Sequence, residues 1–327
     1  MSLMMRAAVL TELGVVRVGD VEVPTLNEDA NVLIRSQVSS ICGSDLHQIF
    51  HEWNSSEIRP PGFPCHETVG IVVESRSPDF APGDRVLGTP DLLHASGFAE
   101  FQALPSRFLI KIEDDSISSQ DIVLAQQLGT TIYAMKRFWT GPGVGTAVVL
   151  GAGSGGLGFT SLCRLAGFEQ IIVSDKYSHR TEAATKLGAT MTVTASTGIV
   201  ETVLEVTDGV GADLVIEAAG TDLTRNQAFD AVRSEGVIGW FGMHENDDIV
   251  FPLKKVFRKK PTIQMRWNAQ AEEGQLSFRK AIELISSGEV DAAAYRMRRF
   301  TIDEVPEALQ IAMNPADGFI KGGVMFE

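Results

Sequence analysis

A cluster of glycines directly after a short apolar run limits the folds open to this chain more than any other sequence feature. The run covers residues 147–150, and an apolar helical stretch, 157–165, follows the cluster. Glycines at such a strand-to-helix turn allow close backbone approach to a pyrophosphate, and the helix N-terminus adds amide donors and a positive dipole. The turn therefore predicts a dinucleotide site. Its expected members are Gly151, Gly153, Gly155, Gly156 and Leu157.

Short runs rich in β-branched residues alternate with helical stretches from about residue 126 onward. Helical periodicity is clearest over residues 180–187 and 224–232. Buried parallel strands separated by helices are typical of a doubly wound α/β sheet. The runs that predict strands are 147–150, 170–174, 191–193, 214–217 and 237–241.

An acidic residue ends the second of these runs. Asp175 lies about 20 residues beyond the last glycine, where a dinucleotide fold places the carboxylate that binds the adenosine ribose. A carboxylate there repels a 2′-phosphate, so the sequence favours NAD over NADP. Lys176 and Arg180 belong to the same predicted site, and as cations they could accept that phosphate. Methyltransferases show similar signals, but they have no need of the metal-ligand cluster described next.

The first 120 or so residues differ in texture, with short strand candidates at 32–38 and 69–74 and a turn opening onto a strand at 82–87. This pattern predicts a small, mostly β domain. It contains Cys42 and, a loop's length later, His66 and Glu67. Zinc takes sulfur, nitrogen and oxygen ligands, and a catalytic zinc keeps three protein ligands and one open position. Cys42 alone could be a buried structural cysteine; the joint pattern favours a catalytic metal.

Composition excludes several classes of protein. The net charge of −14 argues against a nucleic-acid binder, which needs a basic face. Three cysteines cannot form a disulfide framework and fit a reducing compartment, so we expect a cytoplasmic protein. No apolar run is long enough to span a membrane. A length of 327 residues predicts two domains.

Taken together, these motifs resemble those of the zinc-containing medium-chain alcohol dehydrogenases, in the polyol dehydrogenase branch, along nearly the whole chain. The resemblance implies a chaperonin-10-like (GroES-like) β domain, residues 1–125 plus 266–327, with a Rossmann domain, residues 126–265, inserted into it. It also implies a homodimer or homotetramer in which strand 262–265 pairs across a dimer. The segments that carry it are the glycine turn and residues 42–47, 65–70, 82–86, 211–220 and 321–324.

The resemblance also implies roles for individual residues. Cys42 and His66 would be zinc ligands, Glu67 would bind the metal directly or through water, and Asp45 would orient His66. Zinc would act as a Lewis acid toward the substrate oxygen.

Further implied roles concern substrate and cofactor. Ser44 would hydrogen-bond the substrate hydroxyl, His47 would pass its proton on through the cofactor ribose, and Ala219 would contact the cofactor. Side chains that would line the substrate site are Phe50, His51, Trp53, Leu92, Leu93, His94, Trp267 and Asn268.

Two departures from the family pattern affect the metal. The segment 86–101, where the family carries a cysteine-rich lobe, is short and contains no cysteine. We therefore expect no structural zinc and at most one zinc per chain. The usual third ligand position holds Gln126 or Gln127, and a glutamine is a weaker zinc ligand than a carboxylate. Either Gln126 coordinates the metal, or Glu67 substitutes, or zinc binds loosely or not at all. Cys65, beside His66, is expected to serve packing.

The sequence thus predicts an enzyme that moves a hydride reversibly between a small or medium alcohol or polyol and NAD, with zinc as Lewis acid. Two alternatives stay open. One is a zinc-free reductase, and the other is a catalytically silent relative that binds nucleotide as a sensor or structural protein. The complete set of Ser44, Asp45 and His47 favours the enzyme.

Overall fold

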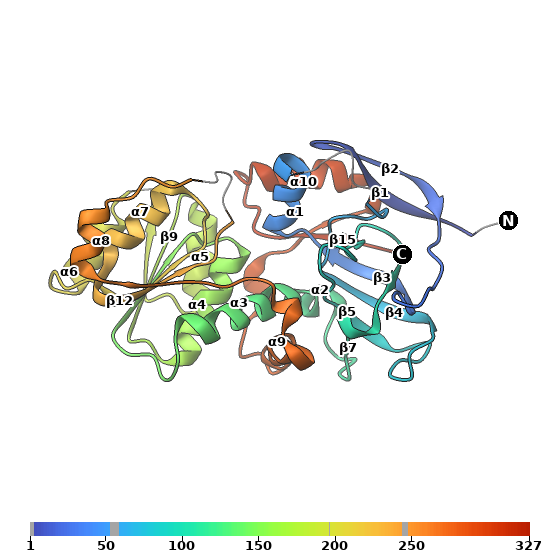
Figure 1. Ribbon diagram of the computed structural model, residues 1–327, viewed down its shortest axis with the longest axis horizontal. Helices are drawn as coiled ribbons and strands as arrows, with labels where there is room; N and C mark the ends of the chain where they lie inside the picture. The colour runs from blue at the N-terminus through green and yellow to red at the C-terminus, as the bar shows by residue number, and fades with distance from the viewer. Residues whose placement is uncertain (1–2, 53–58, 196, 244–247) are drawn as a thin grey trace. The chain divides into compact units, whose positions relative to one another are not determined.

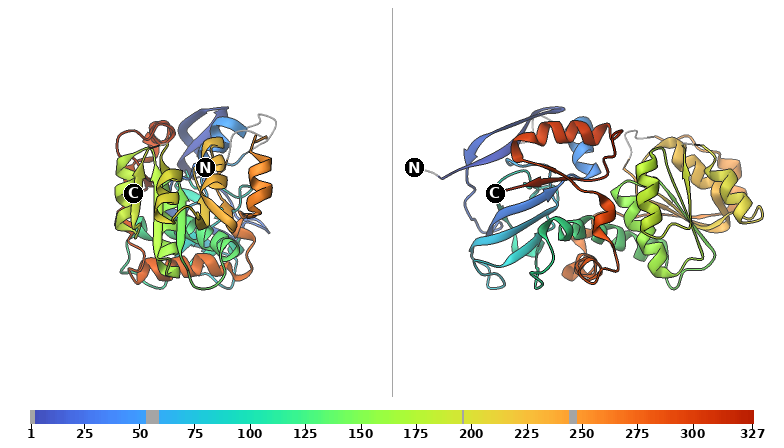
Figure 2. Two further views of the ribbon diagram at one scale, coloured as in Figure 1. Left: turned by 90° about the vertical axis from the view of Figure 1, so that its left-hand side faces the viewer. Right: turned by 180° about the vertical axis from the view of Figure 1, so that it is seen from behind.

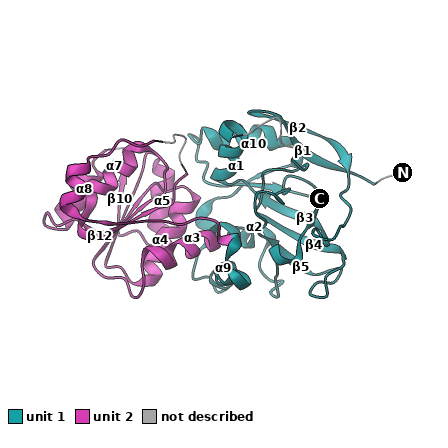
Figure 3. Cartoon of the chain, in the orientation of Figure 1, with its two compact units in different colours: residues 1–127, 270–327 teal, residues 128–269 magenta. Residues whose placement is uncertain are grey.

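The computed structural model describes residues 3–52, 59–195, 197–243 and 248–327. The chain divides into two units, which Figure 3 distinguishes by colour. One unit comprises residues 1–127 and 270–327, and the other comprises residues 128–269. The second unit is therefore an insertion between two separate parts of the first.

A seven-stranded sheet forms the body of the first unit, in the order β14-β15-β3-β4-β5-β7, with β6 also paired to β3. The C-terminal strand β15 pairs antiparallel with β3, and Figure 2 shows the two strands side by side, so the end of the chain joins a sheet whose other strands are mostly N-terminal. The strands of this sheet are β3 (Val32–Ser40), β4 (Thr68–Ser75), β5 (Arg85–Gly88), β6 (Phe101–Leu104), β7 (Leu109–Lys111), β14 (Arg298–Phe300) and β15 (Gly322–Met325).

A separate antiparallel pair, β1 (Met4–Glu12) and β2 (Val15–Glu22), belongs to the same unit. Its α-helices are α1 (Gly43–His47), α2 (Ser119–Ile122), α9 (Leu276–Ser286) and α10 (Val305–Met313). A π-helix, η1 (Gln48–Glu52), continues α1. The 3₁₀ turns are η2 (Ser106–Phe108), η3 (Ala269–Ala271), η4 (Glu273–Gln275), η5 (Ala292–Tyr295) and η6 (Ile302–Glu304).

Two apolar clusters explain why this sheet forms. Alternating residues of β3, among them Val32 and Ile34, are buried against neighbouring strands, as expected of a sheet with one face on a core. A second cluster joins Ile41 and Phe98 to Leu309 of α10 and Val324 of β15. The C-terminal segment therefore supplies part of the core that supports the start of α1.

The second unit contains a six-stranded sheet whose paired strands are all parallel, in the order β10-β9-β8-β11-β12-β13. Its strands are β8 (Thr146–Leu150), β9 (Gln170–Asp175), β10 (Met191–Thr194), β11 (Ala212–Glu217), β12 (Val232–Trp240) and β13 (Thr262–Met265). Strand and helix alternate along the chain, as Figure 1 shows. The doubly wound parallel sheet that the sequence predicts is confirmed.

Helices connect these strands, and the strand order changes direction between β8 and β11. The helices are α3 (Leu124–Phe138), which leads into the unit, and α4 (Ser154–Ala166), α5 (Ser178–Lys186), α6 (Ile199–Val206), α7 (Asp222–Ala231) and α8 (Leu253–Lys259). In the ranges that the structure describes, no helix combines the length and the apolar character needed to cross a membrane.

The glycine turn lies between β8 and α4, and two of its positions exclude any side chain. Gly151 has φ +96°, and a Cβ there would lie 2.8 Å from the Cβ of Ala219. A Cβ on Gly156 would lie 1.8 Å from the carbonyl oxygen of Gly151. Glycine is required at Gly151 by its positive φ and by the loop after β11, and at Gly156 because the helix packs against the backbone of the turn.

Candidate metal centre and cofactor turn

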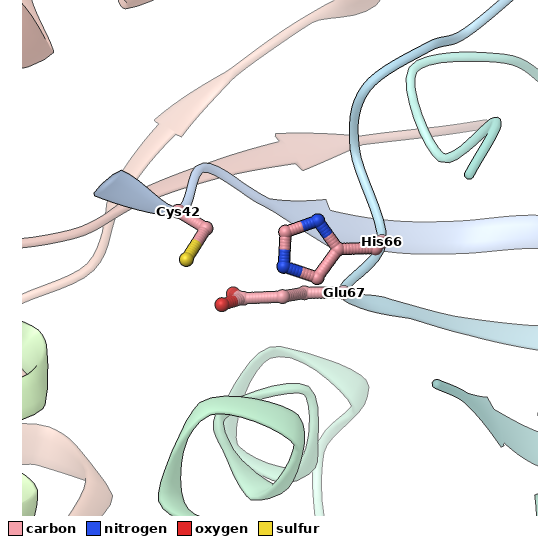
Figure 4. Close-up of side chains that lie close together, drawn as sticks. All are labelled: Cys42, His66 and Glu67. Atoms are coloured by element: carbon pink, nitrogen blue, oxygen red, sulfur yellow. The ribbon is translucent and has the colours of Figure 1, made fainter. Parts of the chain in front are cut away.

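Three potential ligand side chains come together in the first unit. The ligand atoms of Cys42, His66 and Glu67 all lie within 4.8 Å of one another, and Figure 4 shows the sulfur, one ring nitrogen and the carboxylate facing a common point. Cys42 is the extended residue before α1, and the other two immediately precede β4. The two predicted segments meet because they lie at the ends of β3 and β4, which pair directly.

Asp45 fixes the orientation of His66. Its carboxylate is buried, with Oδ1 at 3.1 Å from His66 Nδ1 and Oδ2 accepting the backbone N–H of Cys42 at 2.9 Å. Nδ1 also lies 3.1 Å from the carbonyl oxygen of Pro64. These contacts hold Nδ1 as a donor and leave Nε2 for a metal. Burial opposes protonation of His66, but the charge and hydrogen bond of Asp45 outweigh it and hold the imidazole pKa well above its usual value.

A lysine from the far end of the chain is paired with Glu67. Lys321 Nζ lies 2.6 Å from Glu67 Oε2, and both side chains are almost fully buried, at 1% and 0% exposed. Ser40 Oγ donates to the same oxygen. Burial lowers the pKa of Lys321, but the charge and hydrogen bond of Glu67 together with the charges of Cys42 and Asp45 more than offset it, so the pKa is raised overall.

The second oxygen of that carboxylate fits a metal. Glu67 Oε1 is buried and has no hydrogen-bond partner among the described residues. A buried polar atom without a partner is costly, so its position beside a thiol and an imidazole is best explained by a cation. Sulfur, nitrogen and oxygen donors are the set that zinc takes.

Lys321 was not anticipated as a site residue. The sequence offers one signal, a lysine within an otherwise apolar and glycine-rich C-terminal strand region. Its partner cannot be read from spacing, because the pairing depends on β15 joining β3.

The contested third ligand lies at the start of α3. Gln126 and Gln127 are both buried there, and the role of Gln126 as a ligand stays a prediction. Cys65 is fully buried in the apolar cluster with Phe98 and Val324, and burial raises its thiol pKa well above the usual value. These surroundings agree with packing.

The predicted relay residues lie on α1. Ser44 Oγ is 3.4 Å from His66 Nε2, which places its hydroxyl beside the metal cluster. His47 Nε2 is 2.7 Å from Glu52 Oε1, and Gln48 donates to the other oxygen of Glu52. A π-helical turn relates residues five apart, which is why Glu52 returns to His47. Sequence reasoning missed Glu52, because α-helical spacing would point it elsewhere.

Of the predicted substrate-lining residues, His94 has both ring nitrogens engaged. Nδ1 is 2.5 Å from Asp91 and Nε2 is 2.8 Å from Asp29. Its side chain therefore belongs to a local charge network. Trp53 lies outside the described residues, and the remaining members of that group stay predictions.

The residues predicted to bind the cofactor lie close to the glycine turn of the second unit. Asp175 accepts the backbone N–H of Ala152 at 2.8 Å, and Arg180 Nη1 lies 3.7 Å from the same carboxylate. The ammonium of Lys176 lies 5.0 Å from the ring centroid of Tyr177, whose N–H also reaches Asp175. Asp175, Lys176 and Arg180 thus all lie at or shortly after the end of β9, and their roles in cofactor binding stay predictions.

Each of the two units contains a segment that matches a known domain family. Residues 28–114 match the alcohol dehydrogenase GroES-like domain, and residues 155–287 match the zinc-binding dehydrogenase domain. The GroES-like prediction for the β domain is thereby confirmed.

Individual relatives agree with these matches. The chain is 26% identical over 367 residues to an alcohol dehydrogenase of Cupriavidus necator, with 98% of each chain covered. It is 26% identical over 340 residues to sorbitol dehydrogenase of Bacillus subtilis, with 94% of each covered. The solved structure of an alcohol dehydrogenase from Thermus sp. ATN1 is similar at a TM-score of 0.84 and 25% identity, over 99% of this chain and 100% of that one.

Proposed function

Because the chain belongs to the zinc-containing medium-chain dehydrogenase family and is an oxidoreductase, we propose that it transfers a hydride reversibly between a small or medium alcohol or polyol and NAD, using one catalytic zinc. The grouping of Cys42, His66 and Glu67 beside Ser44 is the observation that carries this proposal. The named activities of relatives, which include a sorbitol dehydrogenase, support an alcohol or polyol as substrate.

Each residue of the site has a distinct task in this proposal. Zinc, when bound, supplies Lewis-acid chemistry at the substrate oxygen, and NAD supplies the hydride acceptor. Ser44 Oγ accepts the proton of the substrate hydroxyl as it gives up its own hydroxyl proton, and His47 receives the proton that is passed on. Glu52, which is half exposed and 2.7 Å from His47 Nε2, passes that proton to solvent. Asp45 keeps His66 in the tautomer that leaves Nε2 for the metal.

A substrate panel tests the proposed reaction. Zinc-loaded protein is incubated with NAD and a series of secondary alcohols and polyols, and nicotinamide absorbance is followed. We expect reduction of NAD with at least one of them, and oxidation of NADH by the corresponding ketone. Absence of turnover with every member of the panel, in protein shown to hold zinc, would contradict the proposal.

The cofactor preference can be tested at Asp175. Replacing it with asparagine keeps an acceptor for the N–H of Ala152 but removes the charge that binds the ribose and repels a 2′-phosphate. A hydrogen bond to a charged group contributes about 1.5–3 kcal/mol, so the affinity ratio of NADH to NADPH should fall roughly tenfold or more. Fluorescence titration measures both constants. Tighter binding of NADPH than of NADH by the unmodified protein would overturn the role given to Asp175.

The oligomer is proposed to form through β13. Among the described residues this edge strand pairs only with β12, and Ile263 and Met265 are exposed on it. Such an edge is a template for pairing with a second copy. We expect Ile263→Lys to shift the protein to monomer in sedimentation velocity, and Leu223→Lys, an exposed leucine on α7, to leave the oligomer intact. An unmodified protein that sediments as a monomer would contradict this.

A further inference from the structure

A buried carboxylate at the end of β11 binds the loop that follows it. Glu217, the last residue of the strand, is fully buried. Its Oε1 accepts the backbone N–H groups of Ala219 at 2.8 Å and Gly220 at 2.7 Å, and the hydroxyl of Thr224 at 2.8 Å. One oxygen atom therefore fixes the loop and the first turn of α7.

A buried arginine joins this loop to the loop that follows β12. Arg225 of α7 is 3% exposed. Its Nη1 donates to the carbonyl oxygen of Gly220 at 3.3 Å, and its Nη2 donates to that of Gly242 at 3.0 Å. Nε lies 3.9 Å from Glu217 Oε2, so the two buried charges compensate each other. The guanidinium thus bridges the ends of two neighbouring strands.

The two loops touch through their backbones. A Cβ on Gly220, whose φ is +80°, would lie 1.9 Å from the carbonyl oxygen of Met243. A Cβ on Gly242 would lie 2.3 Å from the amide nitrogen of Gly220. The backbone N–H of Gly242 also donates to the carbonyl oxygen of Glu217 at 3.0 Å. The two loops are therefore packed backbone against backbone, and Arg225 binds one carbonyl oxygen of each.

The position of these loops at the sheet suggests a function for Glu217 and Arg225. In a sheet of this order, a dinucleotide binds outside the carboxyl ends of the strands, at the point where the strand order reverses. That point lies between β8 and β11, and Ala219 abuts Gly151 of the glycine turn across it. The half of the sheet formed by β8, β9 and β10 carries the glycine turn and Asp175, which suit the adenosine half of the cofactor. The loops after β11 and β12 then face the nicotinamide half.

We propose that Glu217 and Arg225 are positioning residues for the nicotinamide half of the dinucleotide, because they hold the loops after β11 and β12 at the spacing that this half requires. The inference rests on the proposed function, since it presupposes that the second unit binds NAD. It assigns no contact between either side chain and the cofactor. Their effect is transmitted through the backbones of Ala219, Gly220 and Gly242.

Binding measurements with three ligands distinguish this positioning role from a general structural role. The variants Arg225→Met and Glu217→Gln are titrated with NADH, with ADP-ribose, which lacks the nicotinamide ring, and with AMP. Loss of a hydrogen bond to a charged group costs enough to lower NADH affinity roughly tenfold or more. ADP-ribose keeps the second ribose, so its affinity should fall less than that of NADH, and AMP, which is confined to the adenosine half, should keep its affinity within about twofold. Arg225→Lys keeps the positive charge but not the two guanidinium nitrogens that bind both carbonyl oxygens. Its affinity for NADH should lie between those of the unmodified protein and Arg225→Met.

Arg233 provides a control at the other end of the same strands. It lies near the amino end of β12, and its Nε donates to Asp213, near the amino end of β11, at 2.8 Å. Arg233→Met removes an ion pair that is more exposed than that of Arg225, at 34% and 22%, and should leave all three affinities unchanged. Thermal unfolding of each variant reports its stability.

The outcomes distinguish this inference from the proposed function. Unmodified protein that binds neither NADH nor ADP-ribose overturns the proposed function, and this inference with it. If the unmodified protein binds both, and Arg225→Met binds NADH as tightly, only the inference is overturned. Equal losses for NADH and ADP-ribose overturn it too, because they indicate a general disturbance of the unit. Should Arg225→Met fail to fold, Arg225→Lys and Glu217→Gln decide by the same criteria.

Discussion

Cys42→Ala protein should purify without zinc and without alcohol dehydrogenase activity. Changes to residues that only support a metal ligand already lower metal affinity by about 10- to 100-fold, so loss of a thiolate ligand should lower it further. Of the three clustered side chains only His66 and Glu67 would remain, one fewer than the three protein ligands typical of a catalytic zinc. Elemental analysis of freshly purified protein measures the effect, and we expect about one zinc per chain before the substitution and almost none after it.

Two other substitutions serve as controls for the metal. Cys163→Ala removes the buried thiol of the second unit and should leave zinc content unchanged. Gln126→Ala tests the alternative ligand at the start of α3, and loss of zinc in that variant would assign it to the metal. Full zinc occupancy after Cys42→Ala would contradict the predicted metal centre.

The sequence predicts well those features that depend on neighbouring residues. Strands β8, β9 and β11 follow from short apolar runs, and the glycine turn follows from its place between strand and helix. Cys42, Asp45 and His66 meet because the segments that carry them lie at the ends of β3 and β4, which pair directly. Local pattern and direct pairing are enough for such a site.

Residues whose role depends on distant chain segments could not be predicted in this way. Lys321 reaches Glu67 only because the last strand of the chain pairs with β3. Arg225 bridges two loops whose contact depends on the order of strands in the sheet. Glu52 reaches His47 through a π-helical turn, which has no distinct hydrophobic period. The expectation that Glu67 could substitute as the third ligand likewise took no account of Lys321, which pairs with that carboxylate.

Lys321→Met should be among the most destabilising single substitutions in the first unit. It leaves the Glu67 carboxyl group buried with only the hydroxyl of Ser40 beside Oε2. Removal of one partner from a buried ion pair costs about 3–5 kcal/mol. We therefore expect a markedly lower free energy of unfolding when chelator is present. Lys111→Met is the matched control, because Lys111 pairs with Asp84 at 2.8 Å on the surface and should have little effect.

Zinc should reduce that penalty if Glu67 is a direct ligand, and the variant can therefore decide the contested third position. A cation at Oε1 compensates the same carboxylate that Lys321 compensates at Oε2. Because a ligand that binds only the folded state stabilises it, unfolding curves with saturating zinc should converge for Lys321→Met and the unmodified protein. The double variant Lys321→Met with Glu67→Gln removes both charges, so it should recover most of the stability in chelator but gain little from zinc. A zinc-induced gain in the double variant as large as in Lys321→Met would contradict coordination by Glu67 and favour Gln126.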